Sequence, residues 1–308
     1  MKPSRLLAAL VLPFFLASGP AMADLKIGVA MAQFDDAWLT YLRESMVARA
    51  KADPAGVTLQ FEDARADVVR QLSQVESFIS QKVDAIIVAA VDTAAVEQIT
   101  RAVTGAGIPL VYVNRAPEDA QLPKGVAVVV SDELEAGRLQ MQYLADKMAG
   151  QGNIVILLGD LANNATTNRT KGAKEILGHY PGIKVVQEQT GVWLRDRGMT
   201  LVNDWLTQGR QFNAVIANND EMAIGAVMAL KQAGVKPGSV WVAGVDGTPD
   251  ALNAIRKGEL AASVFQDAKG QADGAVDVAV KMASKQSYEA RRVIPFQLIT
   301  PDNVENFR

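Results

Sequence analysis

The chain has 308 residues, no cysteine, a single histidine and a formal net charge of −3. A mildly acidic chain without a basic run lacks the positive surface that binds nucleic acid or anionic lipid, so we expect neither as a partner. With no cysteine and only His179, and with no calcium-loop pattern among the acids, we expect no metal and no cofactor.

The first residues have the composition of a cleavable export signal. Lys2 and Arg5 precede an apolar stretch over 6–17, and Ala21–Ala23 supplies small residues for cleavage. The stretch is shorter than a membrane-spanning helix requires. Because no cysteine follows it to carry a lipid, we expect a mature protein from Asp24 onward, free in the periplasm of a Gram-negative cell.

Short apolar strands then alternate with amphipathic helices. The predicted strands are Lys26–Met31, Thr58–Phe61, Ala85–Ala89, Leu110–Val113, Val126–Val130, Ile154–Leu158, Lys184–Gln189, Ala214–Ala217, Val240–Ala243 and Ala262–Phe265, with an extended tail at Val293–Leu298. The predicted helices are Ala37–Ala52, Val68–Gln81, Ala94–Ala106, Leu134–Met148, Arg169–Leu177, Arg195–Thr207, Glu221–Leu230, one that starts in the turn 244–250, and Asp273–Met282. Continuous apolar strands between helices indicate parallel sheets covered on both faces.

The strand–helix pattern occurs in two sets with no low-complexity linker between them. We therefore predict an α/β fold of two Rossmann-like lobes joined by three crossings of the chain. The N-terminal lobe is assigned to 24–131 plus 267–295, and the C-terminal lobe to 132–266 plus 296–308. Crossings near Ser131, Gln266–Asp267 and Pro295–Phe296 would let two rigid lobes close on a ligand.

Motifs of the common enzyme classes are absent. No Gly-x-Gly-x-x-Gly follows the first strand, and no Walker loop or Gly-x-Ser-x-Gly elbow occurs. His179 stands near a helix end before Pro181, where we interpret it as an exposed turn residue rather than a catalytic base. We expect no enzymatic activity.

Polar and aromatic residues follow the ends of several strands, which is where open α/β sheets bind ligands. They are the segments Phe34–Trp38, Asn114–Arg115 and Asn163–Arg169, together with Trp193, Asn219, Asp246 and Gln266. Indole faces with amide, carboxylate and guanidinium edges suit a ligand with C–H faces and a rim of hydroxyls. Two Arg alone could hold a phosphate, but two Asp bring the charge of the set to zero, which favours a neutral ligand.

Four of these residues also have a plain structural interpretation. Trp38 and Trp193 could be half-buried residues at helix starts, Asp246 a turn residue before Gly247, and Arg169 a solvent-facing side chain. Other residues have only a structural interpretation: Asp220 as the N-cap of its helix, and Trp205, Trp241, Met222 and Met228 as core.

The motifs that carry these residues resemble one family across essentially the whole mature chain. They are similar to motifs of the ribose-type periplasmic sugar-binding proteins, the type I solute-binding proteins of ABC transporters. The motifs are Asp36-Ala37-Trp38, Asn114-Arg115, Arg169, Asn219-Asp220-Glu221-Met222-Ala223, Val245–Asp250 and Gln266. The resemblance implies two lobes closing on a sugar, a permease in the inner membrane as partner, and a monomer. It also implies nine sugar contacts, and it alone selects Asp36 over the adjacent Asp35. The nine are Asp36, Trp38, Asn114, Arg115, Arg169, Trp193, Asn219, Asp246 and Gln266. A chemoreceptor is a further partner compatible with this role.

The chain also departs from the ribose binders. Asn114 stands where they have Asp, Asp36 where they have Asn, and Trp38 and Trp193 where they have Phe. Two indoles offer more flat area than two phenyl rings, which favours a six-membered ring, and Val113–Arg115 resembles inositol-binding members. We therefore predict a cyclic polyol, myo-inositol first, with ribose or an aldopyranose as the alternative. A sugar-responsive regulator on the same core would need an N-terminal DNA-binding segment where the export signal stands.

Overall fold

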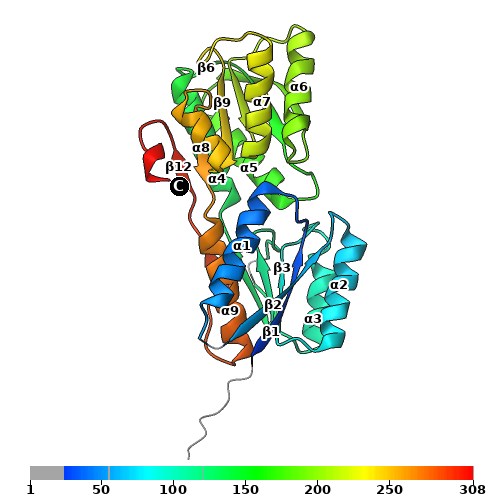
Figure 1. Cartoon of the computed structure of the whole chain (residues 1–308). Coiled ribbons are helices and arrows are strands. Elements are labelled where there is room, and N and C mark those ends of the chain that lie inside the picture. Colours follow the sequence, from blue (N-terminus) through cyan, green and yellow to red (C-terminus); the bar gives the residue numbers. More distant parts are fainter. Residues whose placement is uncertain (1–23, 55, 120, 308) are drawn as a thin grey trace, which may run out of the picture.

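Two six-stranded sheets organise the residues that the computed structural model describes, 24–54, 56–119 and 121–307. The predicted export signal lies outside these residues. Figure 1 shows one lobe above the other, each built around one sheet with helices on both faces. The predicted α/β fold of two Rossmann-like lobes is confirmed.

The sheet of the N-terminal lobe is parallel throughout. Its strands, in spatial order, are β11 (Arg291–Val293), β5 (Val126–Val130), β4 (Leu110–Val113), β3 (Ala85–Val88), β1 (Leu25–Met31) and β2 (Val57–Asp63). The inner strands are fully buried and apolar, as a sheet covered on both faces requires.

The sheet of the C-terminal lobe repeats this order and is parallel except at one edge. Its strands are β12 (Gln297–Ile299), β10 (Ala262–Phe265), β9 (Trp241–Asp246), β8 (Ala214–Ala217), β6 (Gln151–Leu158) and β7 (Gly182–Thr190), and β12 runs antiparallel to β10. Because both sheets reverse their winding at the first strand of each set, β1 and β6, each lobe has its ligand edge beside that strand.

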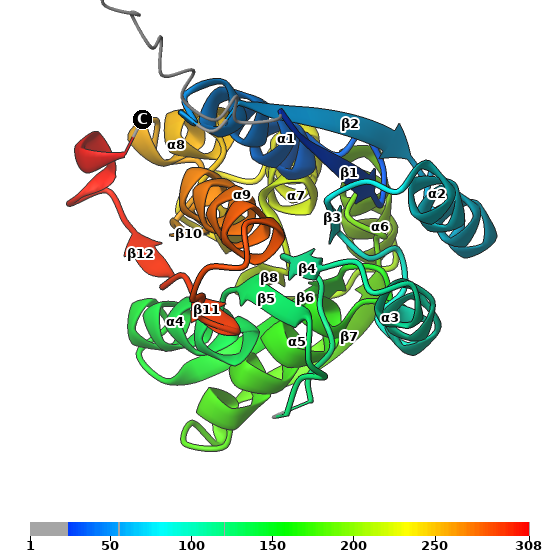
Figure 2. The same ribbon diagram turned by 90° about the horizontal axis from the view of Figure 1, so that it is seen from below.

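Helices cover both faces of each sheet. In the N-terminal lobe, α1 (Ala37–Lys51) and α9 (Ala268–Ala283) lie side by side on one face, and α2 (Val68–Gln81) and α3 (Val96–Gly105) cover the other (Figure 2). In the C-terminal lobe, α4 (Glu133–Lys147) and α5 (Asn164–Leu177) cover one face, and α6 (Arg195–Thr207), α7 (Asp220–Gln232) and α8 (Pro249–Arg256) the other. A short 3₁₀ turn, η1 (Val304–Asn306), follows β12.

Side-chain caps fix where most of these helices begin. Asp36 accepts a hydrogen bond from the peptide N–H of Leu39 at 2.8 Å and so starts α1, and Thr248 caps α8 ahead of Pro249. Asp67, Asp132 and Asp267 cap α2, α4 and α9 in the same way. Each cap sits where a strand turns into a helix, so capping also positions the ligand edge.

The predicted cap of α7 was wrong by one residue. Asn219 is the N-cap, with its Oδ1 accepting from the peptide N–H of Met222 at 3.0 Å. Asp220 is instead fully buried, where it accepts from the peptide N–H of Thr248 at 2.8 Å and from the Ser263 hydroxyl at 2.7 Å. It therefore ties the start of α7 to the turn after β9 and to β10.

Other local predictions also need correction. Helix α5 starts at Asn164 rather than Arg169, because its polar first turn hid the helical period. The predicted extended tail is two short strands in different sheets, β11 and β12, with Pro295 between them. Met228 is 40% exposed, and Trp241 is only partly buried.

The chain passes between the two sheets at three places. These lie between β5 and α4, between β10 and α9, and between β11 and β12. The first two are bridged by a buried hydrogen bond from Gln271 of α9 to Ser131, at 2.9 Å. No helix in the described part of the chain is long and apolar enough to cross a membrane.

Candidate functional site

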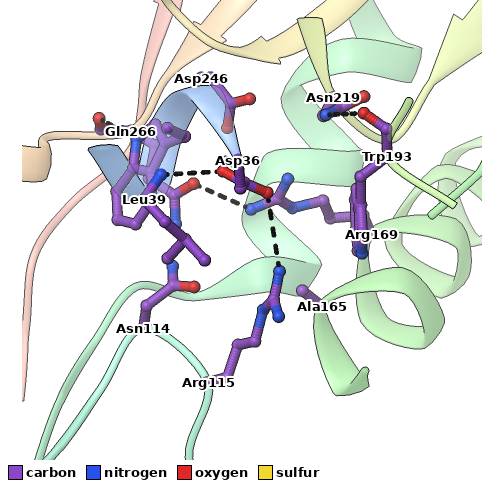
Figure 3. A pocket seen from close by; sticks show the side chains of 11 residues that line it. Asp36, Leu39, Asn114, Arg115, Ala165, Arg169, Trp193, Asn219, Asp246 and Gln266 are labelled. Carbon is purple, nitrogen blue, oxygen red and sulfur yellow. Dashed lines mark hydrogen bonds and ion pairs between the residues drawn. The ribbon is translucent and has the colours of Figure 1, made fainter. Parts of the chain in front are cut away.

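A cavity with about 330 Å³ of space free of protein atoms, part of it open to solvent, lies between the two lobes. All nine residues predicted from the sequence line it, together with Leu39 and Ala165. Figure 3 shows their side chains converging from both lobes. Sequence reasoning missed the last two, because Leu39 falls in the apolar stripe of α1 and Ala165 has no polar atom to draw attention.

The N-terminal lobe contributes Asp36 and Trp38 from the start of α1 and Asn114 and Arg115 from the end of β4. The Asp36 carboxylate lies 3.9 Å from the Arg115 guanidinium, and both side chains are almost fully buried. The Trp38 indole donates to the main-chain oxygen of Gln266 at 3.1 Å, so its N–H is already paired, and the side chain lines the cavity. This lobe thus supplies a flat face beside a charged pair.

Trp193 supplies a second indole from the turn between β7 and α6. Its ring lies against Gly159 at the end of β6, so closely that a Cβ there would stand 2.1 Å from Cη2 of the indole. The indole also lies 5.8 Å from the Arg169 guanidinium, in cation–π range. The absence of a side chain at Gly159 therefore allows the Trp193 ring to pack over the end of β6.

Three of the lining residues have backbone conformations that side chains usually avoid. The φ angles are 63° at Asn114, 70° at Trp193 and 131° at Asp246. Such conformations cost about 1–3 kcal/mol each and occur mostly where function fixes a side chain. Asn is among the residues that tolerate the left-handed region. The backbone conformation at position 114 therefore favours Asn there, in addition to the polar side chain that Asn supplies to the cavity.

Arg169 is held by contacts that the sequence did not indicate. Its Nε lies 2.6 Å from Oε2 of Glu133, Nη1 donates to the main-chain oxygen of Asn218 at 2.7 Å, and Nη2 donates to Oε1 of Gln266 at 3.1 Å. Arg169 and Glu133 are both buried, so this is an interior ion pair. Arg169 is thereby fixed in place as well as charged.

Two buried donors at the cavity have no hydrogen-bond partner among the described residues. They are the indole N–H of Trp193 and the amide nitrogen of Gln266. Buried polar atoms normally pair, so unpaired donors beside a cavity indicate acceptor atoms on a ligand. Asn219, in contrast, uses its Oδ1 to cap α7 and its Nδ2 to hold the main-chain oxygen of Trp193 at 3.1 Å.

The charge balance predicted from the sequence was incomplete. Counting Arg115 and Arg169 against Asp36 and Asp246 gave zero, but Glu133 also belongs to the set because it pairs with Arg169. It was missed because Arg169 stands 36 residues further along the chain, and nothing in the sequence pairs the two. Because Arg169 is already counted, including Glu133 adds one negative charge at the edge of the cavity.

Burial governs the ionisation of these groups. It raises the pKa of Asp246 well above its usual range, with Asp220 and Asp36 adding to the effect and Arg169 opposing it. Burial lowers the pKa of Arg115, against the pull of Asp36. For Arg169, burial alone would lower the pKa, but Glu133 and Asp246 more than offset it and the pKa is raised.

Chemistry beyond binding has no support in the described residues. They contain no group of three or more His, Cys, Asp or Glu side chains placed to hold a metal ion. His179 is exposed, as predicted, and far along the chain from any lining residue. The arrangement binds a small polar molecule between two lobes.

Comparison with known proteins agrees with this geometry. Residues 27–287 match the family described as periplasmic binding protein domain. A putative rhizopine-binding protein of Rhizobium meliloti is 47% identical over 296 residues, which is 95% of each chain. A xylitol-binding protein of Mycolicibacterium smegmatis is 36% identical, over 91% of this chain and 78% of that one.

Among solved structures, an ABC transporter solute-binding protein from Bacillus halodurans with bound myo-inositol is 41% identical, with a TM-score of 0.87, and the match covers 92% of this chain and 97% of that one. The matches therefore span almost all of the described chain rather than one lobe. The chain belongs to the periplasmic binding protein family, as a non-enzymatic sugar- and polyol-binding component of an ABC transporter.

Proposed function

We propose that this protein is the periplasmic receptor that delivers a six-membered cyclic polyol, myo-inositol first, to its ABC permease. The observation that carries the proposal is the cavity itself, in which two buried indoles face a rim of amide, guanidinium and carboxylate groups from both lobes. A bound myo-inositol in a relative of 41% identity supports the ring over an open chain.

The polar rim suits hydroxyl groups because it offers both donors and acceptors. Each hydroxyl donates one hydrogen bond and accepts two, so a ring polyol needs both kinds of partner around its edge. The unpaired N–H groups of Trp193 and Gln266 are donors, and the Asp36 and Asp246 carboxylates are acceptors. We propose that all nine predicted residues contact the ligand, and that Leu39 and Ala165 limit its size.

Release to a permease requires the cavity to open. We propose that the lobes are 24–131 plus 267–295 and 132–266 plus 296–308, and that the crossings near Ser131, Gln266–Asp267 and Pro295–Phe296 serve as hinges. The protein would work as a monomer in the periplasm of a Gram-negative cell after removal of residues 1–23. A chemoreceptor could read the same closed form.

A melting screen of purified, ligand-stripped protein tests the ligand class. A ligand at about a thousand times its dissociation constant adds roughly 4 kcal/mol to the free energy of unfolding, which shifts melting by on the order of 10 °C. We expect such a shift with myo-inositol or another inositol, and smaller shifts with pentoses, hexoses and linear polyols. A large shift with ribose or glucose and none with any inositol would refute the cyclic polyol.

A matched pair of variants locates the binding in this cavity. Asp246→Ala should keep the fold but lose about 2–5 kcal/mol of binding free energy, because the ligand hydroxyls lose a buried charged acceptor. Asp250→Ala, four residues on and 59% exposed at its side chain, should bind as the parent does. Equal affinity for Asp246→Ala and the parent would place the ligand elsewhere.

A further inference from the structure

Asp246 lines the cavity in a backbone conformation that side chains rarely adopt. Its φ angle is 131°, and Gly247 after it also has a positive φ, 74°. Gly adopts such angles without steric cost, but a residue with a side chain keeps them only where the surrounding structure holds it there. The position of the Asp246 carboxylate therefore depends on the contacts that fix the turn after β9.

The carboxylate of Asp220 holds this turn. Its Oδ2 accepts from the peptide N–H of Thr248 at 2.8 Å and from the Thr248 hydroxyl at 3.2 Å. Its Oδ1 accepts from the Ser263 hydroxyl at 2.7 Å, and Oγ of Ser263 in turn accepts from the peptide N–H of Gly247 at 3.1 Å. Both peptide N–H groups that follow Asp246 are thus held by one carboxylate, one directly and one through Ser263.

Asp220 holds the turn without lining the cavity. It is fully buried, whereas the adjacent Asn219 is one of the lining residues. Its Oδ1 packs against Gly244 of β9, where a Cβ would stand only 2.2 Å from it. Losing any of its hydrogen bonds would leave a buried carboxylate short of a donor, which is costly. The turn is therefore attached to a group that is itself fixed inside the C-terminal lobe.

We propose that Asp220 is a positioning residue of the binding site, which acts on the ligand by holding the Asp246 carboxylate where the ligand hydroxyls meet it. This inference rests on the proposed function, in which Asp246 contacts the ligand, and adds a residue outside the cavity. The turn also bears on Gln266, because its peptide N–H donates to the main-chain oxygen of Asp246 at 3.0 Å. Two lining residues therefore depend on Asp220.

The carboxyl groups of Asp220 and Asp246 also lie close enough to affect one another's ionisation. Burial raises the pKa of Asp246 well above its usual range, and the charge of Asp220 adds to this effect. Among the other charged neighbours of Asp246, Arg169 opposes the rise in pKa and Asp36 adds to it. The peptide N–H of Asp220 favours the ionised form of Asp246 as a hydrogen-bond donor. Asp220 is therefore a direct neighbour of the residue that it positions.

A double-mutant cycle between positions 220 and 246 tests the inference. Isothermal titration calorimetry measures the myo-inositol affinity of the full, ligand-stripped parent, Asp220→Ala, Asp246→Ala and the double variant. Asp220→Ala should lose about tenfold in affinity by itself and almost nothing more once Asp246 is replaced, because residues that act through one network are not additive. A residue that only stabilises the lobe would cost the same factor in both backgrounds.

Two further variants separate positioning from stability. Asp220→Asn keeps an acceptor for Thr248 and a polar partner for Ser263, so it should retain most of the parental affinity. Ser263→Ala removes only the hydroxyl that links Asp220 to Gly247 and should lose about fivefold in affinity, as expected for one hydrogen bond. It takes the place of Asp220→Ala in the cycle if that variant does not fold.

Tyr112→Phe is the matched control, because it removes a buried hydroxyl that donates to the main-chain oxygen of Val96 at 2.8 Å and does not line the cavity. It should lower the melting temperature and leave the affinity unchanged. Equal losses from Asp220→Ala with and without the Asp246 carboxylate, or parental affinity in both Asp220→Ala and Ser263→Ala, would overturn the inference and leave the proposed function standing. If myo-inositol does not bind the parent, the proposed function fails and the inference fails with it.

Discussion

The Nε atom of Arg169 lies 2.6 Å from Oε2 of Glu133, and both side chains are buried between helices α4 and α5. The two helices meet at Gly137 and Gly172, where a Cβ would stand 1.9 Å and 2.0 Å from main-chain oxygens of the opposite helix. This close approach brings Glu133 within reach of Arg169. The ion pair therefore connects the first chain crossing, between β5 and α4, to Arg169 in the lining of the cavity.

Glu133→Gln should be strongly destabilising, because it leaves Arg169 buried with a neutral partner. Breaking a buried pair typically lowers the free energy of unfolding by about 3–5 kcal/mol, and urea denaturation would measure the loss. Glu135→Gln, on the same helix with a side chain 47% exposed, should change it by no more than about 0.5 kcal/mol. Similar losses of unfolding free energy for the two substitutions would show that the buried ion pair stabilises the fold no more than an exposed one does.

Gly159→Ala should weaken ligand binding without altering any predicted contact residue. The added methyl group would stand 2.1 Å from the Trp193 ring, so the indole has to leave its position over β6. We expect about a tenfold loss of affinity by calorimetry, the order expected for a lost aromatic contact. Gly105→Ala, where a Cβ meets no atom within 4 Å, is the control and should bind normally. Unchanged affinity in Gly159→Ala would argue against stacking on Trp193.

Hydrogen bonds between the lobes at the rim of the cavity should favour the closed form. Thr93 of the N-terminal lobe donates to the main-chain oxygen of Ala162 at 3.2 Å and accepts from the peptide N–H of Asn164 at 3.2 Å. Asn168 donates to Glu118 across the same gap at 2.6 Å.

Combining Thr93→Ala with Asn168→Ala removes these three hydrogen bonds, although neither residue lines the cavity. At a net value near 1 kcal/mol for each hydrogen bond, affinity should fall on the order of a hundredfold. The loss should appear mainly as faster ligand dissociation in stopped-flow measurements. Asn253→Ala, exposed on α8, controls for loss of a surface amide. Parental kinetics in the double variant would show that these contacts do not hold the lobes together.

Stability should fall as the pH rises from about 4 to about 7. Burial raises the pKa of Asp220 to about 7, whereas an Asp in the unfolded chain titrates near 3.9. Between these values the folded state keeps a proton that the unfolded state has released, so raising the pH favours unfolding. The loss is on the order of 2–4 kcal/mol for a fully buried group.

Asp220→Asn should make this profile less steep, with a remaining slope of the same sign from Asp246, whose pKa burial also raises. Its amide oxygen can still accept from Thr248, and its amide nitrogen can donate to the Ser263 hydroxyl, which accepts as readily as it donates. Thermal melting over pH 4–8 measures the profile, with exposed Asp196→Asn as the control. An Asp220→Asn profile as steep as the parental one would contradict the assignment to Asp220.

The strands and the region that lines the cavity were predictable because both depend on local features of the sequence. Buried parallel strands read as apolar runs, and the residues that follow them, such as Asn114 and Asp246, meet at one edge whatever the details of packing. The family resemblance selected nine residues at these strand ends, and all nine line the cavity. Strand ends therefore indicated the region of the cavity, and the resemblance indicated the individual residues.

Features that depend on contacts between helices were not predictable in the same way. The sequence does not single out Glu133, and only the close packing of α4 on α5 shows it to be the partner of Arg169. Gly137 and Gly172, each on the same helix face as one of the charged residues, were the available signal. The role of Asp220 likewise depends on two neighbouring strand ends, so adjacent Asn219 and Asp220 could not be told apart as caps.

Small-angle X-ray scattering, with and without ligand, tests most directly whether the two lobes close on a cyclic polyol between them. Ligand-stripped protein should have a larger radius of gyration than protein saturated with an inositol that raises its melting temperature. The saturated curve should match the structure described above, with the lobes in contact at Thr93 and Ala162. Asp246→Ala at the same ligand concentration should stay in the larger form. Identical radii for stripped and saturated parent protein, with binding shown by the melting shift, would contradict closure.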